Sequence, residues 1–89
     1  MIALITGASR GIGRAIALRF ADAENVKLCL CYHSNKDGAD AVAQACADLG
    51  SEVFLVQADI RDSEAASDLV RACVERYGHI DVLVNNAGI

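Results

Sequence analysis

The sequence predicts an α/β fold in which helices cover both faces of one parallel sheet. Apolar segments of the kind that form buried strands alternate with segments of helical periodicity, and no proline interrupts either kind. Such alternation leads through right-handed crossovers onto a parallel sheet. We expect four strands and three helices in strand order 3-2-1-4, with the first two helices on one face and the third on the other. This arrangement is an incomplete doubly wound fold.

The first strand and the first helix are predicted by two different apolar patterns. Residues 2–6, Ile-Ala-Leu-Ile-Thr, are apolar without alternation, as in a parallel strand that is buried on both faces and central in its sheet. After a glycine-rich stretch, Ile12, Ile16 and Phe20 recur every fourth residue, while Arg14 lies on the other side. The spacing predicts an amphipathic helix whose apolar stripe contains these three side chains.

The remaining strands and helices follow the same alternation. Residues 26–31, 53–57 and 81–85 predict the second, third and fourth strands. Asp62 can cap the third helix, and Gly78 can end it. The apolar stripes of the second and third helices are expected on Ala39, Val42, Ala43 and Cys46 and on Ala66, Leu69, Val70, Cys73 and Tyr77.

The length and charge of the chain limit the functions that it can have. The chain has 89 residues, a formal net charge of −4 and no cluster of lysine or arginine, which argues against nucleic acid as a partner. No segment approaches the roughly 20 apolar residues of a membrane span. Met1 opens directly into the first strand without a targeting segment, so we expect a cytoplasmic protein.

The four cysteines are expected to pack in the core. Cys29, Cys31, Cys46 and Cys73 show neither Cys-x-x-Cys spacing nor the histidine companions of a zinc site. Two fall within the second strand and two on apolar helix faces, where a small thiol packs well. We expect no metal site.

The glycine-rich turn between the first strand and the first helix predicts a phosphate site. Gly7 can adopt the backbone angles that leave the strand sharply, and Gly11 lacks a side chain that would block a pyrophosphate. Gly13 lets helix and sheet approach closely. The amides and the dipole at the helix N-terminus then favour an anion. A glycine-rich turn without a ligand is the alternative, and the position of this turn between strand and helix argues against it.

Two motifs together carry a family resemblance. The segment 6–13, Thr-Gly-x-x-x-Gly-x-Gly, resembles the cofactor motif of the short-chain dehydrogenase/reductase family, and residues 85–88, Asn-Asn-Ala-Gly, resemble the motif that ends its fourth strand. The resemblance covers the whole chain and implies a Rossmann-like fold. The residues of the two motifs look most similar to those of the β-ketoacyl-acyl-carrier-protein reductases of fatty acid biosynthesis. Many sugar and alcohol dehydrogenases share these motifs. The resemblance implies cofactor contacts from Gly7, Ser9, Arg10, Gly11, Ile12, Gly13, His33, Asp59, Ile60, Asn86, Ala87 and Gly88.

The end of the second strand favours NADP(H) over NAD(H). An NAD-binding member usually places an acidic residue there, about 20 residues past the turn. This chain has Tyr32, His33 and Ser34 at that position, and Arg10 matches a position where relatives carry a basic residue for the 2′-phosphate. The alternative is NAD, with Asp37 or Asp40 bending back to supply the acid.

The catalytic residues of the family are not expected in this chain. The family uses a tyrosine, a lysine four residues later, a serine and an asparagine, and all of them lie beyond residue 89 by the resemblance. Tyr32 and Lys36 have the required spacing, but they span a strand end and a loop instead of one helical turn. Asn86 belongs to a motif that supports the sheet and lines the cofactor pocket in relatives. We therefore expect no catalytic site and no activity from these 89 residues alone.

The organisation expected from these observations is the N-terminal, dinucleotide-binding part of a single-domain enzyme over residues 1–89, without its catalytic half. Two alternatives stay open: a stand-alone nucleotide-binding or redox-sensing module, and an inactive truncated remnant. Because the fourth strand would be an open edge and one helix cannot cover its face of four strands, we also expect self-association. The contact should involve that edge or the bare sheet face.

Overall fold

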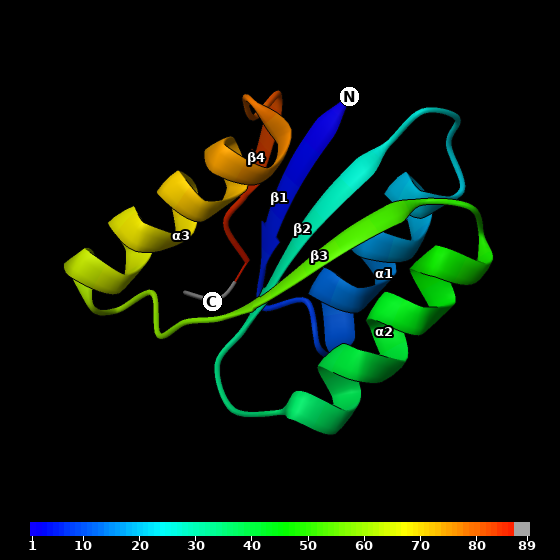
Figure 1. The fold of residues 1–89 in the computed structure, drawn as a ribbon. Coiled ribbons are helices and arrows are strands. Elements are labelled where there is room, and N and C mark those ends of the chain that lie inside the picture. The colour runs from blue at the N-terminus through cyan, green and yellow to red at the C-terminus, as the bar shows by residue number, and fades with distance from the viewer. Residues whose placement is uncertain (87–89) are drawn as a thin grey trace.

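The computed structural model describes residues 1–86, and residues 87–89 lie outside the described part (Figure 1). Strands and helices alternate along the chain as the sequence predicts. The elements are β1 (Ile2–Thr6), α1 (Gly11–Ala21), β2 (Lys27–Tyr32), α2 (Lys36–Asp48), β3 (Glu52–Gln57), α3 (Ser63–Tyr77) and β4 (Val82–Val84).

The sheet has the predicted order, β3-β2-β1-β4, and all its strand pairs are parallel. Strand β1 is central and every one of its residues is buried, as its unbroken apolar run indicates. Its Leu4 is in register with Cys29 of β2 on one side and with Leu83 of β4 on the other. The β4 strand forms one edge of the sheet and β3 forms the other.

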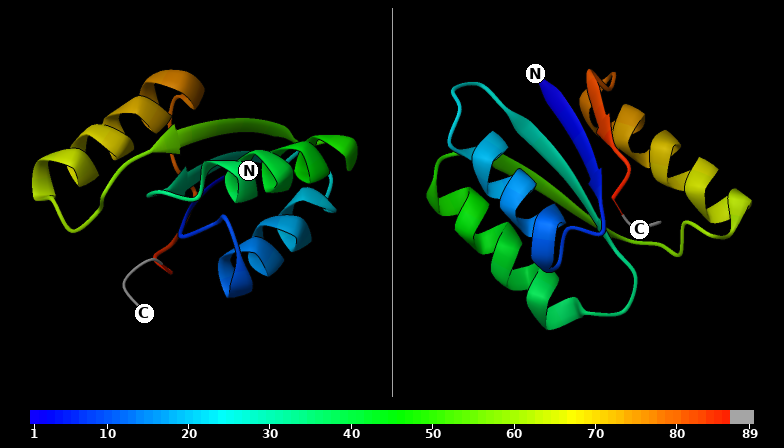
Figure 2. Two further views of the ribbon diagram at one scale, coloured as in Figure 1. Left: turned by 90° about the horizontal axis from the view of Figure 1, so that it is seen from below. Right: turned by 180° about the vertical axis from the view of Figure 1, so that it is seen from behind.

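Helices α1 and α2 lie on one face of the sheet and α3 lies on the other (Figure 2). Alternate strand residues divide between the two layers because successive side chains of a strand point to opposite faces. Ile5 and Leu30 pack in the cluster with α1 and α2, whereas Leu4 packs with α3. The four cysteines are all buried, which confirms them as core residues.

Helix α1 is fully buried only at small residues, and the predicted stripe is buried in part. Its buried positions are Gly13, Ala17 and Ala21. Ile12, predicted in the stripe, is 65% exposed. Ile16 and Phe20 of the stripe are partly buried and pack against the core cluster. The helix approaches the turn closely at Gly13, since a Cβ added there would overlap the carbonyl oxygen of Gly7.

Helix α3 leaves part of its sheet face bare. Val70, which the sequence placed in the buried stripe, is 43% exposed, and Val74 is 39% exposed. Leu83 lies on the same sheet face, because its partner Leu4 packs against α3, and it is 59% exposed. The helix packs over β1, β2 and β3, so the expected uncovered apolar surface is present beside β4.

None of the helices within residues 1–86 is long and apolar enough to cross a membrane.

Candidate functional site

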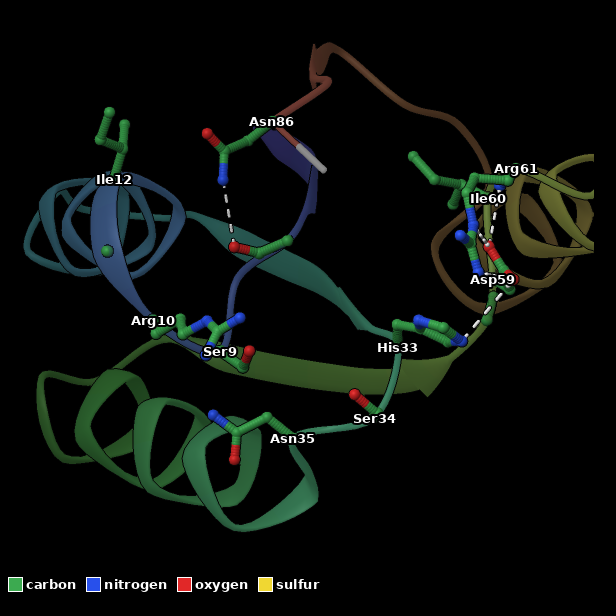
Figure 3. A pocket seen from close by; sticks show the side chains of 13 residues that line it. Ser9, Arg10, Ile12, His33, Ser34, Asn35, Asp59, Ile60, Arg61 and Asn86 are labelled. Carbon is green, nitrogen blue, oxygen red and sulfur yellow. Dashed lines mark hydrogen bonds and ion pairs between the residues drawn. The ribbon is translucent and has the colours of Figure 1, made fainter. Parts of the chain in front are cut away.

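A cavity of about 470 Å³ lies where the strands end at their carboxyl sides (Figure 3). Ligands of parallel α/β proteins bind at this edge of the sheet, where the strand order reverses. The cavity collects segments that follow β1, β2, β3 and β4. Its lining residues are Gly7, Ser9, Arg10, Gly11, Ile12, His33, Ser34, Asn35, Ala58, Asp59, Ile60, Arg61 and Asn86.

The three glycines of the turn meet three different requirements. Gly7 and Gly11 have φ angles of 63° and 62°, in the left-handed region that favours glycine. A Cβ added at Gly11 would have no heavy atom within 4 Å, so the backbone there is open to a ligand. A Cβ added at Gly13 would lie 2.7 Å from Nδ2 of Asn86 as well as overlapping Gly7. Gly13 is thus a packing residue, and it does not line the cavity.

The N-terminus of α1 differs from those of the other two helices. Its N-cap residue, Arg10, is extended and makes no side-chain capping hydrogen bond, and the first turn has no acidic residue. By contrast, Asn35 caps α2 by accepting from the Gly38 N–H at 3.1 Å. Asp62 caps α3, as predicted, by accepting from the Glu64 N–H at 2.9 Å. Helix α1 therefore keeps its positive end without a side-chain acceptor, which suits an anionic ligand.

Polar contacts from the end of β4 hold the glycine turn in place. Asn86 donates from Nδ2 to the carbonyl oxygen of Gly7 at 3.1 Å, and its main-chain N–H donates to Oγ1 of Thr6 at 3.0 Å. The Thr6 hydroxyl lies 3.3 Å from Oδ1 of Asn85. These bonds join residues about 80 positions apart in the chain and fix the turn against the sheet.

The opposite side of the cavity carries a charged group at the end of β3. Arg61 donates from Nε and Nη2 to the two carboxylate oxygens of Asp59, at 3.0 and 2.9 Å. The Arg61 guanidinium lowers the pKa of Asp59 to about 2, so this carboxyl is ionised at neutral pH. Nε2 of His33, at the end of β2, lies 3.6 Å from Oδ2 of Asp59 (Figure 3).

Most residues expected at the site lie together. Nine of them line the cavity: Gly7, Ser9, Arg10, Gly11, Ile12, His33, Asp59, Ile60 and Asn86. Ala87 and Gly88 lie outside the described residues. Sequence reasoning missed Ser34, Asn35, Ala58 and Arg61. Each lies within four residues of a predicted strand end, and that position is the signal that could have found them.

Tyr32 and Lys36 have the spacing of the family's catalytic pair, but the structure places them on different elements. Tyr32 is the last residue of β2 and is buried, whereas Lys36 is the first residue of α2. Nζ of Lys36 lies 2.8 Å from Oδ2 of Asp40 on the exposed side of the helix. Tyr32 and Lys36 are therefore not one turn apart on a helix. Within residues 1–86, no group of three or more histidine, cysteine, aspartate or glutamate side chains is placed to hold a metal ion.

The strand order, the glycine turn at a helix N-terminus and the cavity at the strand ends define a nucleotide-binding α/β protein of the Rossmann type. The sequence matches the short chain dehydrogenase family over residues 1–89. The chain belongs to the short-chain dehydrogenase/reductase family.

Curated relatives and solved structures agree with this assignment. The chain is 44% identical over 87 residues to a 3-oxoacyl-[acyl-carrier-protein] reductase, FabG, of Staphylococcus epidermidis, and 42% identical over 88 residues to a 3-oxoacyl-[acyl-carrier-protein] reductase of Synechocystis. A short-chain dehydrogenase/reductase from Serratia marcescens matches 96% of the chain at 40% identity with a TM-score of 0.90. The two sequence matches include 98% and 99% of this chain. They span only 35% of each relative, and the structural match spans 34% of the Serratia protein.

Proposed function

We propose that this chain is the NADP(H)-binding part of an oxidoreductase that transfers hydride between NADP(H) and a carbonyl or alcohol. The observation that carries the proposal is the uncapped N-terminus of α1, which opens on the cavity beside Arg10. Phosphates bind at such helix termini because unsatisfied N–H groups and the helix dipole favour negative charge.

The lining residues fit the parts of a dinucleotide. The pyrophosphate would lie at the first turn of α1, where the backbone at Gly11 is open. The adenine would lie between the ends of β2 and β3, beside Asp59 and Ile60. Arg10 would reach the 2′-phosphate, and His33 would lie beside it. The bound nicotinamide would supply the hydride, and the residues of this chain would hold and orient the cofactor.

The charges around the cavity support NADP(H). No carboxylate among the described residues at the end of β2 lines the cavity. Asp37 and Asp40, the alternative acids, both lie in α2 and do not line the cavity. Asp40 forms an ion pair with Lys36. Asp59 does line the cavity, but it follows β3 and its charge is matched by Arg61. A 2′-phosphate beside Arg10 would therefore meet no unpaired carboxylate.

The proposed substrate class is the 3-oxoacyl thioester, because the relatives from Staphylococcus and Synechocystis bear that activity in their names. A second candidate is an alcohol dehydrogenase, since a putative short-chain alcohol dehydrogenase from Sinorhizobium meliloti matches at 35% identity with a TM-score of 0.86. The proposal includes a cytoplasmic location, where the four unpaired cysteines would stay reduced.

Calorimetric titration of the chain with NADPH and with NADH tests the proposal. We expect tighter binding of NADPH, and we expect Arg10→Ala to reduce that preference while leaving NADH binding little changed. Arg19→Ala is the matched control, because Arg19 lies in the last turn of α1 away from the cavity. Equal affinities for the two cofactors, or a preference for NADH that persists in Arg10→Ala, would contradict the NADP(H) assignment.

A further inference from the structure

The segment that follows β3 is held by contacts on both sides of Asp59. The main-chain N–H of Ala58 donates to the carbonyl oxygen of Tyr32 at 3.0 Å, so the segment stays beside the end of β2. Ala58 and Ile60 pack against the buried cluster between the sheet and α3. The carbonyl oxygen of Asp59 accepts from the N–H of Asp62 at 3.1 Å, which closes a tight turn just before α3. The backbone of Asp59 is therefore fixed in the wall of the cavity.

Arg61 occupies most of the acceptor positions of the Asp59 carboxylate. Oδ1 accepts from the Arg61 main-chain N–H at 3.1 Å and from its Nε at 3.0 Å, and Oδ2 accepts from Nη2 at 2.9 Å. An ionised carboxylate has about four acceptor positions, two on each oxygen. The two parallel side-chain bonds fix the orientation of the carboxylate as well as its position. One acceptor position remains, and it is on Oδ2.

The remaining acceptor position of Oδ2 is open to the cavity. Nε2 of His33 lies 3.6 Å from Oδ2, which is longer than a hydrogen bond. Figure 3 shows the two side chains directed toward each other from the ends of β2 and β3. The Asp59 side chain is 35% exposed, so a ligand in the cavity can reach it. Because Arg61 lowers the pKa of Asp59 to about 2, the carboxylate has no proton to donate at neutral pH, and the open position can only accept.

We propose that Arg61 is a positioning residue that makes Asp59 selective for the amino group of adenine. This inference rests on the proposed function, in which the adenine of a dinucleotide lies between the ends of β2 and β3. The adenine amino group is a hydrogen-bond donor and fits the single open acceptor position on Oδ2. A purine with a carbonyl oxygen in the same place, such as hypoxanthine, would set one acceptor against another.

The selectivity needs Arg61 because Asp59 alone would not be held in one orientation. The bond that carries a carboxylate has a broad torsional preference, so an unpaired aspartate turns easily. The Arg61 guanidinium stops this rotation, and it leaves the same oxygen facing the end of β2 in every molecule. The Arg61 side chain is 80% exposed, and exposed ion pairs contribute little to the stability of a fold. Substitution of Arg61 should therefore change the recognition of the base and leave the chain folded.

Calorimetric titration with two cofactors that differ at this one group tests the inference. The probes are NADPH and reduced nicotinamide hypoxanthine dinucleotide phosphate, in which a carbonyl oxygen replaces the adenine amino group. We expect the unaltered chain to bind NADPH about tenfold more tightly, which is the effect of one net hydrogen bond. Arg61→Ala should lose most of this preference. Arg61→Lys keeps the positive charge but lacks the two parallel donors, so it should not restore the preference in full.

Two controls separate the orientation of Asp59 from other effects. Arg71→Ala removes another exposed arginine, which pairs with Asp68 at 3.1 Å on α3 and does not line the cavity. This variant should keep the preference for NADPH over the hypoxanthine cofactor. The ratio of the affinities for NADPH and NADH reports on the 2′-phosphate, and it should be the same in Arg61→Ala as in the unaltered chain.

The outcomes distinguish this inference from the proposed function. If NADPH binds and the hypoxanthine cofactor binds equally well to the unaltered chain, the inference fails while the proposed function stands. The inference also fails if Arg61→Ala keeps the preference, if Arg61→Lys restores it in full, or if Arg71→Ala loses it. Absence of binding by both cofactors would overturn the inference and the proposed function together.

Discussion

The sharpest test of the site geometry is Gly13→Ala, because it adds one methyl group where backbones touch. The new Cβ would overlap the Gly7 carbonyl oxygen, and it would lie 2.7 Å from Nδ2 of Asn86 and 2.8 Å from the Gly7 carbonyl carbon. Two of these three neighbours are main-chain atoms of a turn that the Asn86 side chain holds by a hydrogen bond. Relief of the overlap requires α1 to move away from the turn.

The loss of stability can be worked out from these contacts. Overpacking costs about 3 kcal/mol at the upper end of its range, and loss of the bond from Asn86 to Gly7 adds about 1 kcal/mol. Alanine in place of glycine within a helix offsets about 1 kcal/mol. A net loss of about 3 kcal/mol is therefore expected in the free energy of unfolding. A chain of this length has roughly 4 to 13 kcal/mol in total, so the variant should be strongly destabilised.

Urea denaturation followed by circular dichroism measures this loss, with Gly50→Ala as the matched control. Gly50 follows α2, has a φ of 99°, and an added Cβ there would meet no atom within 4 Å. That variant should lose about 1 kcal/mol from backbone strain alone. If Gly13→Ala loses no more than Gly50→Ala, the close approach of α1 to the turn is not a constraint on this fold, and the reasoning fails.

Three further results are expected. The 89-residue chain should give no turnover of an acetoacetyl thioester with NADPH, and activity that disappears in Tyr32→Phe would show that this tyrosine is catalytic after all. Sedimentation should show self-association at low concentration that weakens in Leu83→Asp, whereas a monomer at high concentration would show that the bare face and the β4 edge are tolerated. Nuclear magnetic resonance should find Asp59 titrating near pH 2, with its pKa rising in Arg61→Ala. Because this pKa is depressed, the stability that the Asp59 pair contributes should be present above about pH 4 and disappear as the pH falls toward 2; an ordinary pKa in the unaltered chain would contradict the pairing.

The sequence was sufficient for the fold and for most of the residues that line the cavity. An unbroken apolar run at residues 2–6 can lie only where a strand is buried on both faces, which places β1 at the centre of the sheet. Strand–helix alternation and the handedness of crossovers predict a parallel sheet, and the Rossmann arrangement implied by the family resemblance adds the order 3-2-1-4. The carboxyl ends of parallel strands meet at one edge, so the glycine turn, the residues after β2 and those after β3 had to lie close together.

Three features were decided by the tertiary structure, because each depends on a distance between elements and not on a period along the chain. The backbone contact at Gly13 brings α1 close to the turn, with Ala17 buried and Ile12 exposed. The ends of β2 and β3 brought His33 within 3.6 Å of Asp59, a pairing that no periodicity encodes. The packing of α3 placed Cys73 in one buried cluster with Cys29 and Cys31 of β2, which no pattern in the sequence indicated.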